Sequence, residues 1–293
     1  MTDTIDLRSL DDRVEIAPGV MMPRLGLGTY KAAAGADVER EIATGLGIGY
    51  RGIDTAALYA NEESIGRAVR ASGVPRDELF VATKVWNADQ GYRTTIEACE
   101  RSLGLLGMDH VDLYLFHWPM PPLMRDTWRA MEDLLGAGKT RAIGVCNCLP
   151  HHLEELLSFA RVPPAVDQVE HHPRLQRPAL RDFCRARGIT VQAWAPIMRG
   201  RVADIPEIAG IARRHGKSPS QVSIRWILQH GVAAIPKSVH ADRVAENADV
   251  FDFALDAAEM DAIDRLDRDE RIGPDPDTFG VSGWVERFRP GAH

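Results

Sequence analysis

Four residues of types that can move a proton stand at or just after the ends of three successive strand-like segments. Asp54 and Tyr59 follow the first segment, Lys84 ends the second, and His117 ends the third. Titratable side chains at the carboxyl ends of parallel strands are what a β/α barrel presents at its catalytic face. A lysine beside a tyrosine can make the phenol a usable proton donor near neutral pH, because a nearby cation favours the phenolate. This pairing predicts chemistry on a carbonyl group.

The elements that must position these residues alternate along the chain between strand-like and helix-like segments. The strand-like segments centre on residues 25–29, 52–54, 80–84, 111–117, 142–147, 166–169, 190–194 and 233–236. The helix-like segments lie at residues 37–46, 62–72, 94–106, 125–137, 150–159, 179–187 and 218–230. Most of the strands lack polar alternation, as expected when both faces of a parallel sheet are buried.

These segments predict eight βα units and therefore a single (β/α)8 barrel of the TIM type. Residues 14–17 and 20–23 flank Pro18-Gly19 and predict a hairpin that plugs the lower end of the barrel. Extra helices are expected at 241–250 and 256–267. A doubly wound sheet is the rival fold, but no strand is followed by a Gly-x-Gly-x-x-Gly turn. We find no linker and expect residues 1–293 to form one domain.

Composition excludes several classes of partner. The net charge is −7 and the pI is about 5.8, whereas a nucleic-acid or anionic-membrane partner requires a basic face. No apolar stretch approaches the length needed to cross a membrane, and residues 1–13 contain no apolar signal core. The four cysteines are scattered, which is typical of reduced thiols. We therefore expect a cytoplasmic protein.

Each of the four titratable residues has an ordinary structural explanation when it is taken alone. Asp54 could cap a helix, Tyr59 could be a packing aromatic, and His117 could be a structural histidine. Lys84 could be a surface charge, or it could be a Schiff-base amine of an aldolase-type barrel enzyme. Their common position at one end of three consecutive strands favours a joint site.

The motifs around these residues resemble the signatures of the aldo-keto reductase family, and the resemblance runs through essentially the whole chain. The chain is most similar to the prokaryotic group that includes diketogluconate reductases and glyoxal-type reductases. The matching segments are Gly49-Tyr50-Arg51, Asp54-Thr55-Ala56, Tyr59, Asn61-Glu62, Thr83-Lys84, Asp112-Leu113-Tyr114, His117-Trp118-Pro119, Ile143 to Asn147, Gln168 to Pro173, Ile235 to Ser238, Arg243 and Glu246-Asn247.

The resemblance implies an NADPH-dependent oxidoreductase that reduces aldehydes and small ketones or dicarbonyls to alcohols. Tyr59 would be the general acid that protonates the carbonyl oxygen. Lys84 would lower the pKa of Tyr59 from its reference value of about 10, and Asp54 would pair with Lys84. His117 would orient the substrate carbonyl. We expect no metal, because nicotinamide carries the hydride chemistry.

The resemblance also implies the residues that bind the cofactor. Asn147 and Gln168 would hold the nicotinamide carboxamide, and Trp194 would stack on the ring. Thr29 and Asp54 would approach the nicotinamide ribose. The residues expected at the pyrophosphate, the adenosine 2′-phosphate and the adenine are Pro196, Ile197, Lys237, Ser238, Arg243, Glu246 and Asn247. Two cations and a hydroxyl around one phosphate would select NADPH. The alternatives are a helix cap for Ser238 and a solvated position for Arg243.

The chain departs from the family pattern at three positions in the cofactor region. Cys146 replaces a serine that would donate a hydrogen bond to the carboxamide, and Cys148 replaces a larger phenylalanine. His240 stands where relatives often carry arginine, which would weaken phosphate binding.

Three pairs of residues could suggest a metal or redox site: Cys146 with Cys148, His151-His152 and His171-His172. Two thiols are a weak signal for such a site. The side chains of adjacent residues diverge, and no helix-spaced partner accompanies either histidine pair. We therefore interpret these histidines as structural.

Tyr30, Trp86 and Trp118 each lie within two residues of Thr29, Lys84 or His117, and they predict an apolar pocket for a small carbonyl substrate. Packing at the barrel rim is the alternative explanation. The tail, with Phe279 and Trp284, leaves few residues for a lid, so we expect an open site in a monomer. A rival function is a non-catalytic NADPH-binding module that senses redox state, which an intact set of four titratable residues disfavours.

Overall fold

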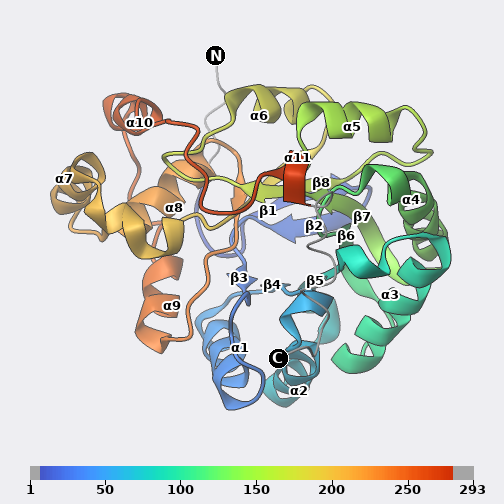
Figure 1. The fold of residues 1–293 in the computed structure, drawn as a ribbon. Coiled ribbons are helices and arrows are strands. Elements are labelled where there is room, and N and C mark those ends of the chain that lie inside the picture. Colours follow the sequence, from blue (N-terminus) through green and yellow to red (C-terminus); the bar gives the residue numbers. More distant parts are fainter. Residues whose placement is uncertain (1–6, 280–293) are drawn as a thin grey trace.

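The computed structural model describes residues 7–279, in which a parallel sheet is surrounded by helices (Figure 1). The eight strands of this sheet follow one another in chain order, from β3 to β10. Their bounds are β3 Leu27–Gly28, β4 Gly52–Asp54, β5 Phe80–Val85, β6 Val111–Phe116, β7 Thr140–Cys146, β8 Val166–Glu170, β9 Thr190–Trp194 and β10 Ala233–Ala234. The first and last strands meet through a parallel bridge between Leu25 and Ala234. The N–H of Gly26 donates to the Ala234 carbonyl (2.9 Å), so the sheet closes into the predicted barrel.

The helices that follow the strands cover the outside of the barrel, and several of them begin at a proline. Proline suits the first helical turn, because the missing N–H has no intrahelical partner there. The helix bounds are α1 Ala36–Ile48, α2 Glu62–Ser72, α3 Tyr92–Leu106, α4 Pro121–Gly136, α5 Pro150–Leu157, α6 Pro178–Arg185, α7 Pro206–His215, α8 Pro219–Gln229, α9 Ala241–Ala248, α10 Ala257–Asp264 and α11 Pro276–Phe279. Among the described residues, no helix is both long and apolar enough to cross a membrane.

The predicted amino-terminal hairpin is present, and it packs against inward-facing residues of the barrel strands. Its strands β1 (Arg13–Ala17) and β2 (Val20–Pro23) pair antiparallel around Gly19, whose φ of 71° favours glycine. The apolar hairpin side chains pack in one cluster with inward-facing residues of the barrel strands. The members from the hairpin are Ile16, Val20 and Met22, and those from the strands include Phe80, Leu113, Leu115, Ala142 and Val166.

Two helices in the described part of the chain were not predicted, and a third begins earlier than predicted. Helix α7 contains Gly210 in its middle, and a glycine inside a helix weakens the helical signal. Helix α11 spans only four residues, too few to show a period. Helix α4 begins at Pro121 rather than at residue 125, because two prolines occupy its first turn.

Two glycines in helices provide a matched test of the packing between α2 and α3. A Cβ added at Gly66 would lie 2.2 Å from the backbone oxygen of Leu106, whereas a Cβ added at Gly47 would meet nothing within 4 Å. We predict that Gly66→Ala lowers the free energy of unfolding by about 1–3 kcal/mol through overpacking. Gly47→Ala should raise it by roughly 0.5–1 kcal/mol, because alanine favours an exposed helix position. Urea unfolding measures both values, and a stabilising Gly66→Ala would contradict this packing.

Candidate active site

A fully buried ion pair lies where β4 and β5 end. Lys84 on β5 is 0% exposed, and its ammonium donates to Asp54 Oδ1 at 2.6 Å and to the Thr55 carbonyl oxygen at 2.8 Å. The parallel register pairs Asp54 with Ala82, so Lys84 lies two residues beyond the last paired residue, and its side chain reaches back to the end of β4. Burial alone lowers the pKa of Lys84, but the Asp54 carboxylate and other nearby groups outweigh it and raise this pKa above its ordinary value. Lys84 is therefore a permanent cation.

Tyr59 lies beside this cation, at the end of a short 3-10 turn formed by Ala57–Tyr59. The Lys84 ammonium is 5.2 Å from the centre of the Tyr59 ring. Burial raises the pKa of Tyr59 above its ordinary value, and Lys84 lowers it only in part. The expected influence of Lys84 on this pKa is thus present, but burial outweighs it, so the phenol remains protonated at neutral pH.

His117 follows β6 and completes the group. It is 8% exposed, and its ring centre is 5.6 Å from that of Tyr59 and 5.2 Å from that of Trp86. Burial, helped by the Lys84 cation, holds the pKa of His117 well below its usual range, so the imidazole is neutral. Its Nδ1 has no hydrogen-bond partner among residues 7–279. The structure therefore brings Asp54, Tyr59, Lys84 and His117 together at one end of the barrel.

A hydrogen-bonded chain of amides and an indole adjoins this group. Asn147 donates to the carbonyl oxygen of His117 (2.9 Å) and accepts from the indole N–H of Trp194 (2.8 Å). The amide of Gln168 donates to Asp54 Oδ2 (2.7 Å) and to Gln192 (2.8 Å). Gln192 was not predicted as a site residue. It is an amide side chain within the mainly apolar strand β9, and this position could have indicated a role in the site.

Thr29 and Cys146, which the sequence placed in the cofactor region, both contact residues around the ion pair. The Thr29 hydroxyl donates to the Asp54 carbonyl oxygen at 2.9 Å, which joins β3 to β4 beside the ion pair. Cys146, at the end of β7, is buried as a free thiol, and its sulfur lies 3.9 Å from the Gln168 side-chain oxygen. Burial raises the pKa of Cys146 well above its ordinary value, which leaves an unreactive thiol. Cys148 is also buried and free.

The residues expected at the pyrophosphate and at the adenosine end lie after β9 and β10, away from the ion pair along the chain. The loop after Trp194 contains Pro196, whose carbonyl accepts from Ser223 (2.7 Å), and Ile197. After β10, Ser238 accepts a hydrogen bond from the backbone N–H of His240 (3.1 Å), and Lys237 donates to the Lys31 carbonyl (3.4 Å). The N-cap residue of α9 is His240, so Ser238 is not the cap of this helix.

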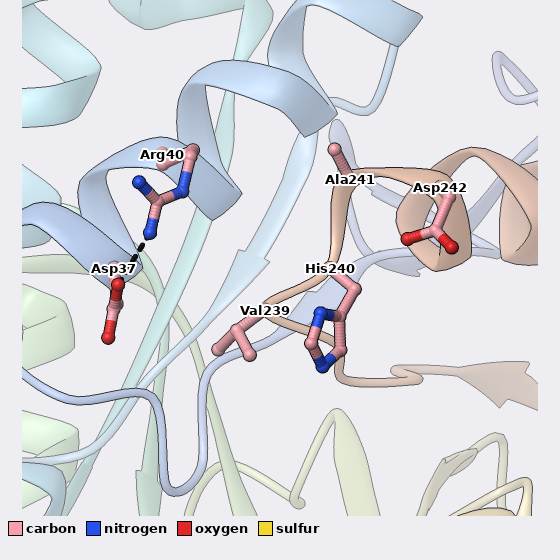
Figure 2. A pocket seen from close by; sticks show the side chains of 6 residues that line it. All are labelled: Asp37, Arg40, Val239, His240, Ala241 and Asp242. Carbon is pink, nitrogen blue, oxygen red and sulfur yellow. Dashed lines mark hydrogen bonds and ion pairs between the residues drawn. The ribbon is translucent and has the colours of Figure 1, made fainter.

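On α9, Arg243 is exposed and Asn247 is buried, while Glu246 accepts a hydrogen bond from Ser218. A hollow of about 630 Å³ lies beside this segment, between residues 239–242 and α1 (Figure 2). Arg40 of α1 lines it and was not among the predicted site residues.

Aromatic side chains surround the Tyr59 and His117 end of the site. The Tyr30 ring lies 5.1 Å from that of Tyr59 and is 45% exposed, whereas Trp86 and Trp118 are buried. Phe279 of α11 packs over this wall, with its ring 4.4 Å from Trp118 and 6.2 Å from Trp86. The tail up to Phe279 therefore narrows a site that we expected to be open. Trp284, the other tail aromatic, lies outside the described residues.

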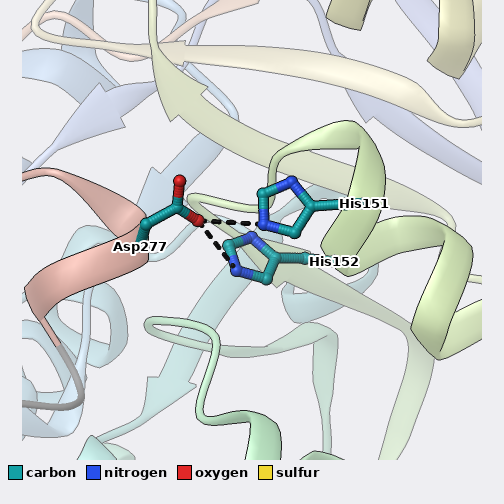
Figure 3. A group of neighbouring side chains, drawn as sticks. All are labelled: His151, His152 and Asp277. Atoms are coloured by element: carbon teal, nitrogen blue, oxygen red, sulfur yellow. Dashed lines mark hydrogen bonds and ion pairs between the residues drawn. The ribbon is translucent and has the colours of Figure 1, made fainter.

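Helix α11 is held in this place by two histidines of α5. The Nε2 atoms of His151 and His152 lie 2.9 Å and 3.3 Å from the same oxygen of Asp277 (Figure 3). The expectation that adjacent histidine rings diverge is wrong here, since the ring centres are 4.0 Å apart. These rings lie in the first turn of α5, where the backbone of Leu149 fixes one of them.

The same three residues have the donor types of a metal site, with ligand atoms within 4.8 Å of one another. The hydrogen bonds favour docking instead. The Leu149 N–H donates to Nδ1 of His152 (3.1 Å), so a neutral His152 carries its proton on Nε2 and donates it to Asp277. Burial, with the nearby His151, lowers the pKa of His152 and so favours this neutral form. A nitrogen that carries a proton has no lone pair for a metal ion.

Comparisons with known proteins agree with the sequence motifs. The model of the Aldo/keto reductase family matches residues 24–268. The chain is 52% identical over 269 residues to a glyoxal reductase of Bacillus subtilis (strain 168), covering 92% of this chain and 98% of that protein. It is 48% identical over 273 residues to a 9,11-endoperoxide prostaglandin H2 reductase of Trypanosoma cruzi (strain CL Brener), covering 92% and 96%. A solved structure of a Gox0644 mutant in complex with NADPH superposes with a TM-score of 0.85 and 42% identity, covering 91% and 98%.

The contact between α11 and α5 can be tested by removing its carboxylate. We predict that Asp277→Ala loosens α11 and exposes Trp118 and Trp86, because Phe279 no longer covers them. Acrylamide quenching of tryptophan fluorescence should increase in this variant. The matched control is Asp182→Ala, which removes an exposed pair with Arg185 on α6 and should leave quenching unchanged. Equal quenching in Asp277→Ala and the wild type would show that Asp277 does not hold α11.

Proposed function

The chain belongs to the aldo/keto reductase family, and we propose that it reduces aldehydes and small ketones or dicarbonyls to alcohols, with NADPH as hydride donor and Tyr59 as general acid. The observation that carries this proposal is the buried Lys84 cation between Asp54 and Tyr59, with a neutral His117 beside the phenol. The glyoxal reductase relative supports the choice of a small carbonyl substrate.

Tyr59 has the properties that the proton step requires. A general acid must hold its proton until the reaction, and the raised pKa of Tyr59 ensures this. When the phenol gives its proton to the carbonyl oxygen, a negative charge forms on Tyr59. The Lys84 ammonium stabilises that charge, and it does so without reorganisation because Asp54 and Thr55 already hold it in place.

His117 would orient the substrate for this transfer. Its neutral ring offers one N–H donor, and its position 5.6 Å from the Tyr59 ring allows both side chains to address the same carbonyl oxygen. A permanently protonated Lys84, by contrast, is a poor nucleophile, which argues against the Schiff-base alternative.

The residues around the ion pair fit a nicotinamide. Hydride transfer to the carbonyl carbon is the chemistry that NADPH supplies when bound. Trp194 is half-buried and fixed through its N–H by Asn147, so a ring face is available for stacking. We assign the nicotinamide half to Thr29, Asp54, Asn147, Gln168 and Trp194, and the pyrophosphate to Pro196 and Ile197. We assign the adenosine half to Lys237, Ser238, Arg243, Glu246 and Asn247. The NADPH complex of the structural neighbour supports this cofactor.

The aromatic wall favours compact substrates. Tyr30, Trp86, Trp118 and Phe279 offer mainly apolar contact, and one methylene in such a pocket discriminates by only about 1–3 kcal/mol. Small activated dicarbonyls should react best, because the adjacent carbonyl makes the reacting carbon more electrophilic. Consumption of NADPH absorbance with methylglyoxal, an aromatic aldehyde and a steroid ketone tests the range. A steroid ketone preferred by more than tenfold would contradict a compact pocket.

We predict that Tyr59→Phe abolishes carbonyl reduction and leaves NADPH binding nearly intact. Only the phenolic proton is removed, and general acid catalysis contributes typically 10² to 10⁴-fold. Turnover with methylglyoxal and quenching of Trp194 fluorescence by NADPH measure the two effects separately. If the variant kept more than about a tenth of the wild-type turnover, Tyr59 would not be the general acid.

A further inference from the structure

A glutamate that the proposed chemistry does not use is buried near the adenosine end of the site. Glu41 lies on α1 and is 1% exposed. Neither of its carboxylate oxygens has a hydrogen-bond partner of good geometry among the described residues. Its helix neighbours Val38 and Ile42 are completely buried. Burying a carboxylate without a partner is costly when it is charged, so a group in this position calls for an explanation.

Glu41 faces the segment that we assign to the 2′-phosphate. Burial raises the pKa of Glu41 to about 7, while the Lys237 ammonium and the nearby backbone N–H of Ser238 lower it in part. Lys237 is not held by Glu41, because its side chain donates to the Lys31 carbonyl. The carboxyl group therefore influences the phosphate region through its charge and does not position Lys237.

The surroundings of Glu41 contain charges of both signs. Figure 2 shows Asp37 and Arg40 across the hollow from residues 239–242. Asp37 lies about one helical turn before Glu41, and Arg40 is the residue just before it. The Arg40 guanidinium pairs with Asp37 at 2.5 Å, and both side chains are exposed to solvent. The charged or titratable side chains on α1 near Glu41 and on the elements packed against α1 are Asp37, Glu39 and Arg40 of α1, Glu62, Glu63, Arg67 and Arg70 of α2, Lys237 and His240 after β10, and Asp242, Arg243 and Glu246 of α9.

We propose that Glu41 is a specificity-determining residue for the cofactor, which takes up a proton when a 2′-phosphate binds at Lys237 and Ser238. This inference rests on the proposed use of NADPH. A phosphate dianion placed beside Glu41 makes the carboxylate form less favourable, so binding and protonation occur together. NADH lacks the 2′-phosphate and leaves the protonation of Glu41 unchanged. The charged Glu41 carboxylate therefore weakens NADPH binding at high pH. Once it is protonated, the neutral carboxyl group no longer repels the phosphate.

The sign of the effect follows from the ionisation of Glu41. Below pH 7 the carboxyl group is mostly neutral, and the phosphate meets Lys237 and Ser238 without a competing anion. Above pH 7 a proton must be taken from solvent, and each bound proton changes the apparent affinity by up to tenfold per pH unit. Glu41→Gln keeps the size of the side chain and removes the charge. This variant should therefore bind NADPH more tightly than the wild type at pH 8, by up to about tenfold, and equally at pH 6.

Isothermal titration calorimetry of the full chain tests the proposal. NADPH and NADH are titrated into the wild type and Glu41→Gln at pH 6 and pH 8. The titrations at a pH near 7.5 are repeated in two buffers of different ionisation enthalpy, which gives the number of protons taken up. The wild type should take up more protons with NADPH than Glu41→Gln does, and the two proteins should agree with NADH. Other groups that titrate in this range, the phosphate included, are common to both proteins and cancel in the comparison.

Two further variants serve as controls. Arg243→Ala should weaken NADPH by about one to two decades at both pH values without affecting NADH, since it removes a charge-assisted contact with the phosphate. Glu41→Ala replaces Glu41→Gln if the glutamine variant does not fold, and thermal unfolding checks both. Either variant should remove the difference in proton uptake.

The possible outcomes separate this inference from the proposed function. Tight NADPH binding with the same proton uptake in the wild type and Glu41→Gln would overturn the inference alone. Weaker NADPH binding in Glu41→Gln would also overturn it and would show that the carboxylate positions Lys237. A wild type that does not bind NADPH would overturn the proposed function and this inference together.

Discussion

The arrangement of the site depends on one buried cation. The ammonium of Lys84 has no contact with water, and a charge in such a place is tolerated only when its hydrogen bonds are satisfied within the protein. Asp54 and the Thr55 carbonyl provide two of these bonds. Asp54 in turn accepts from Gln168, so residues from β4, β5 and β8 are joined around one charge. Removing any member would leave a buried polar group without its partner.

The barrel satisfies this requirement because its parallel strands end at the same edge. Closure through Leu25 and Ala234 brings the first strand beside the last. The neighbouring strands β3 and β4 place the Thr29 hydroxyl against the Asp54 carbonyl oxygen. The apolar side chains of the hairpin pack against inward-facing residues of the strands. On the other side, α11 places Phe279 over the aromatic wall. Because Lys84 and Asp54 are only 0% and 3% exposed, their electrostatic interaction is stronger than it would be in water.

Most of the barrel and the grouping of the four titratable residues could be predicted from the sequence, because both are properties of short segments. An apolar strand and the residue that follows it can be recognised in the sequence without knowledge of the fold. Val111–Phe116 and His117 are an example. Contacts between distant segments could not be predicted in the same way. The docking of Asp277 on His151 and His152 joins residues more than a hundred positions apart, and α11 is too short to show a helical period.

The burial of charged groups could not be predicted from the sequence either. The position of Lys84 predicted that it would lower the pKa of Tyr59, but the opposing effect of burial depends on the packed structure. Glu41 lies in an ordinary amphipathic helix pattern, and only the approach of the segment after β10 makes it unusual. Local patterns therefore located the candidate site, whereas its electrostatics required the fold.

We propose that Asp54 and Lys84 act on Tyr59 as one unit. The most direct measurement is the single-turnover rate of hydride transfer from bound NADPH to methylglyoxal in Asp54→Asn, Lys84→Met and the double variant. Residues that act as a unit give strongly non-additive losses. If Lys84→Met lowers the rate on the order of 10²-fold or more, the double variant should be no slower than Lys84→Met alone. Losses that multiply in the double variant would show that Asp54 and Lys84 act independently and would contradict the account.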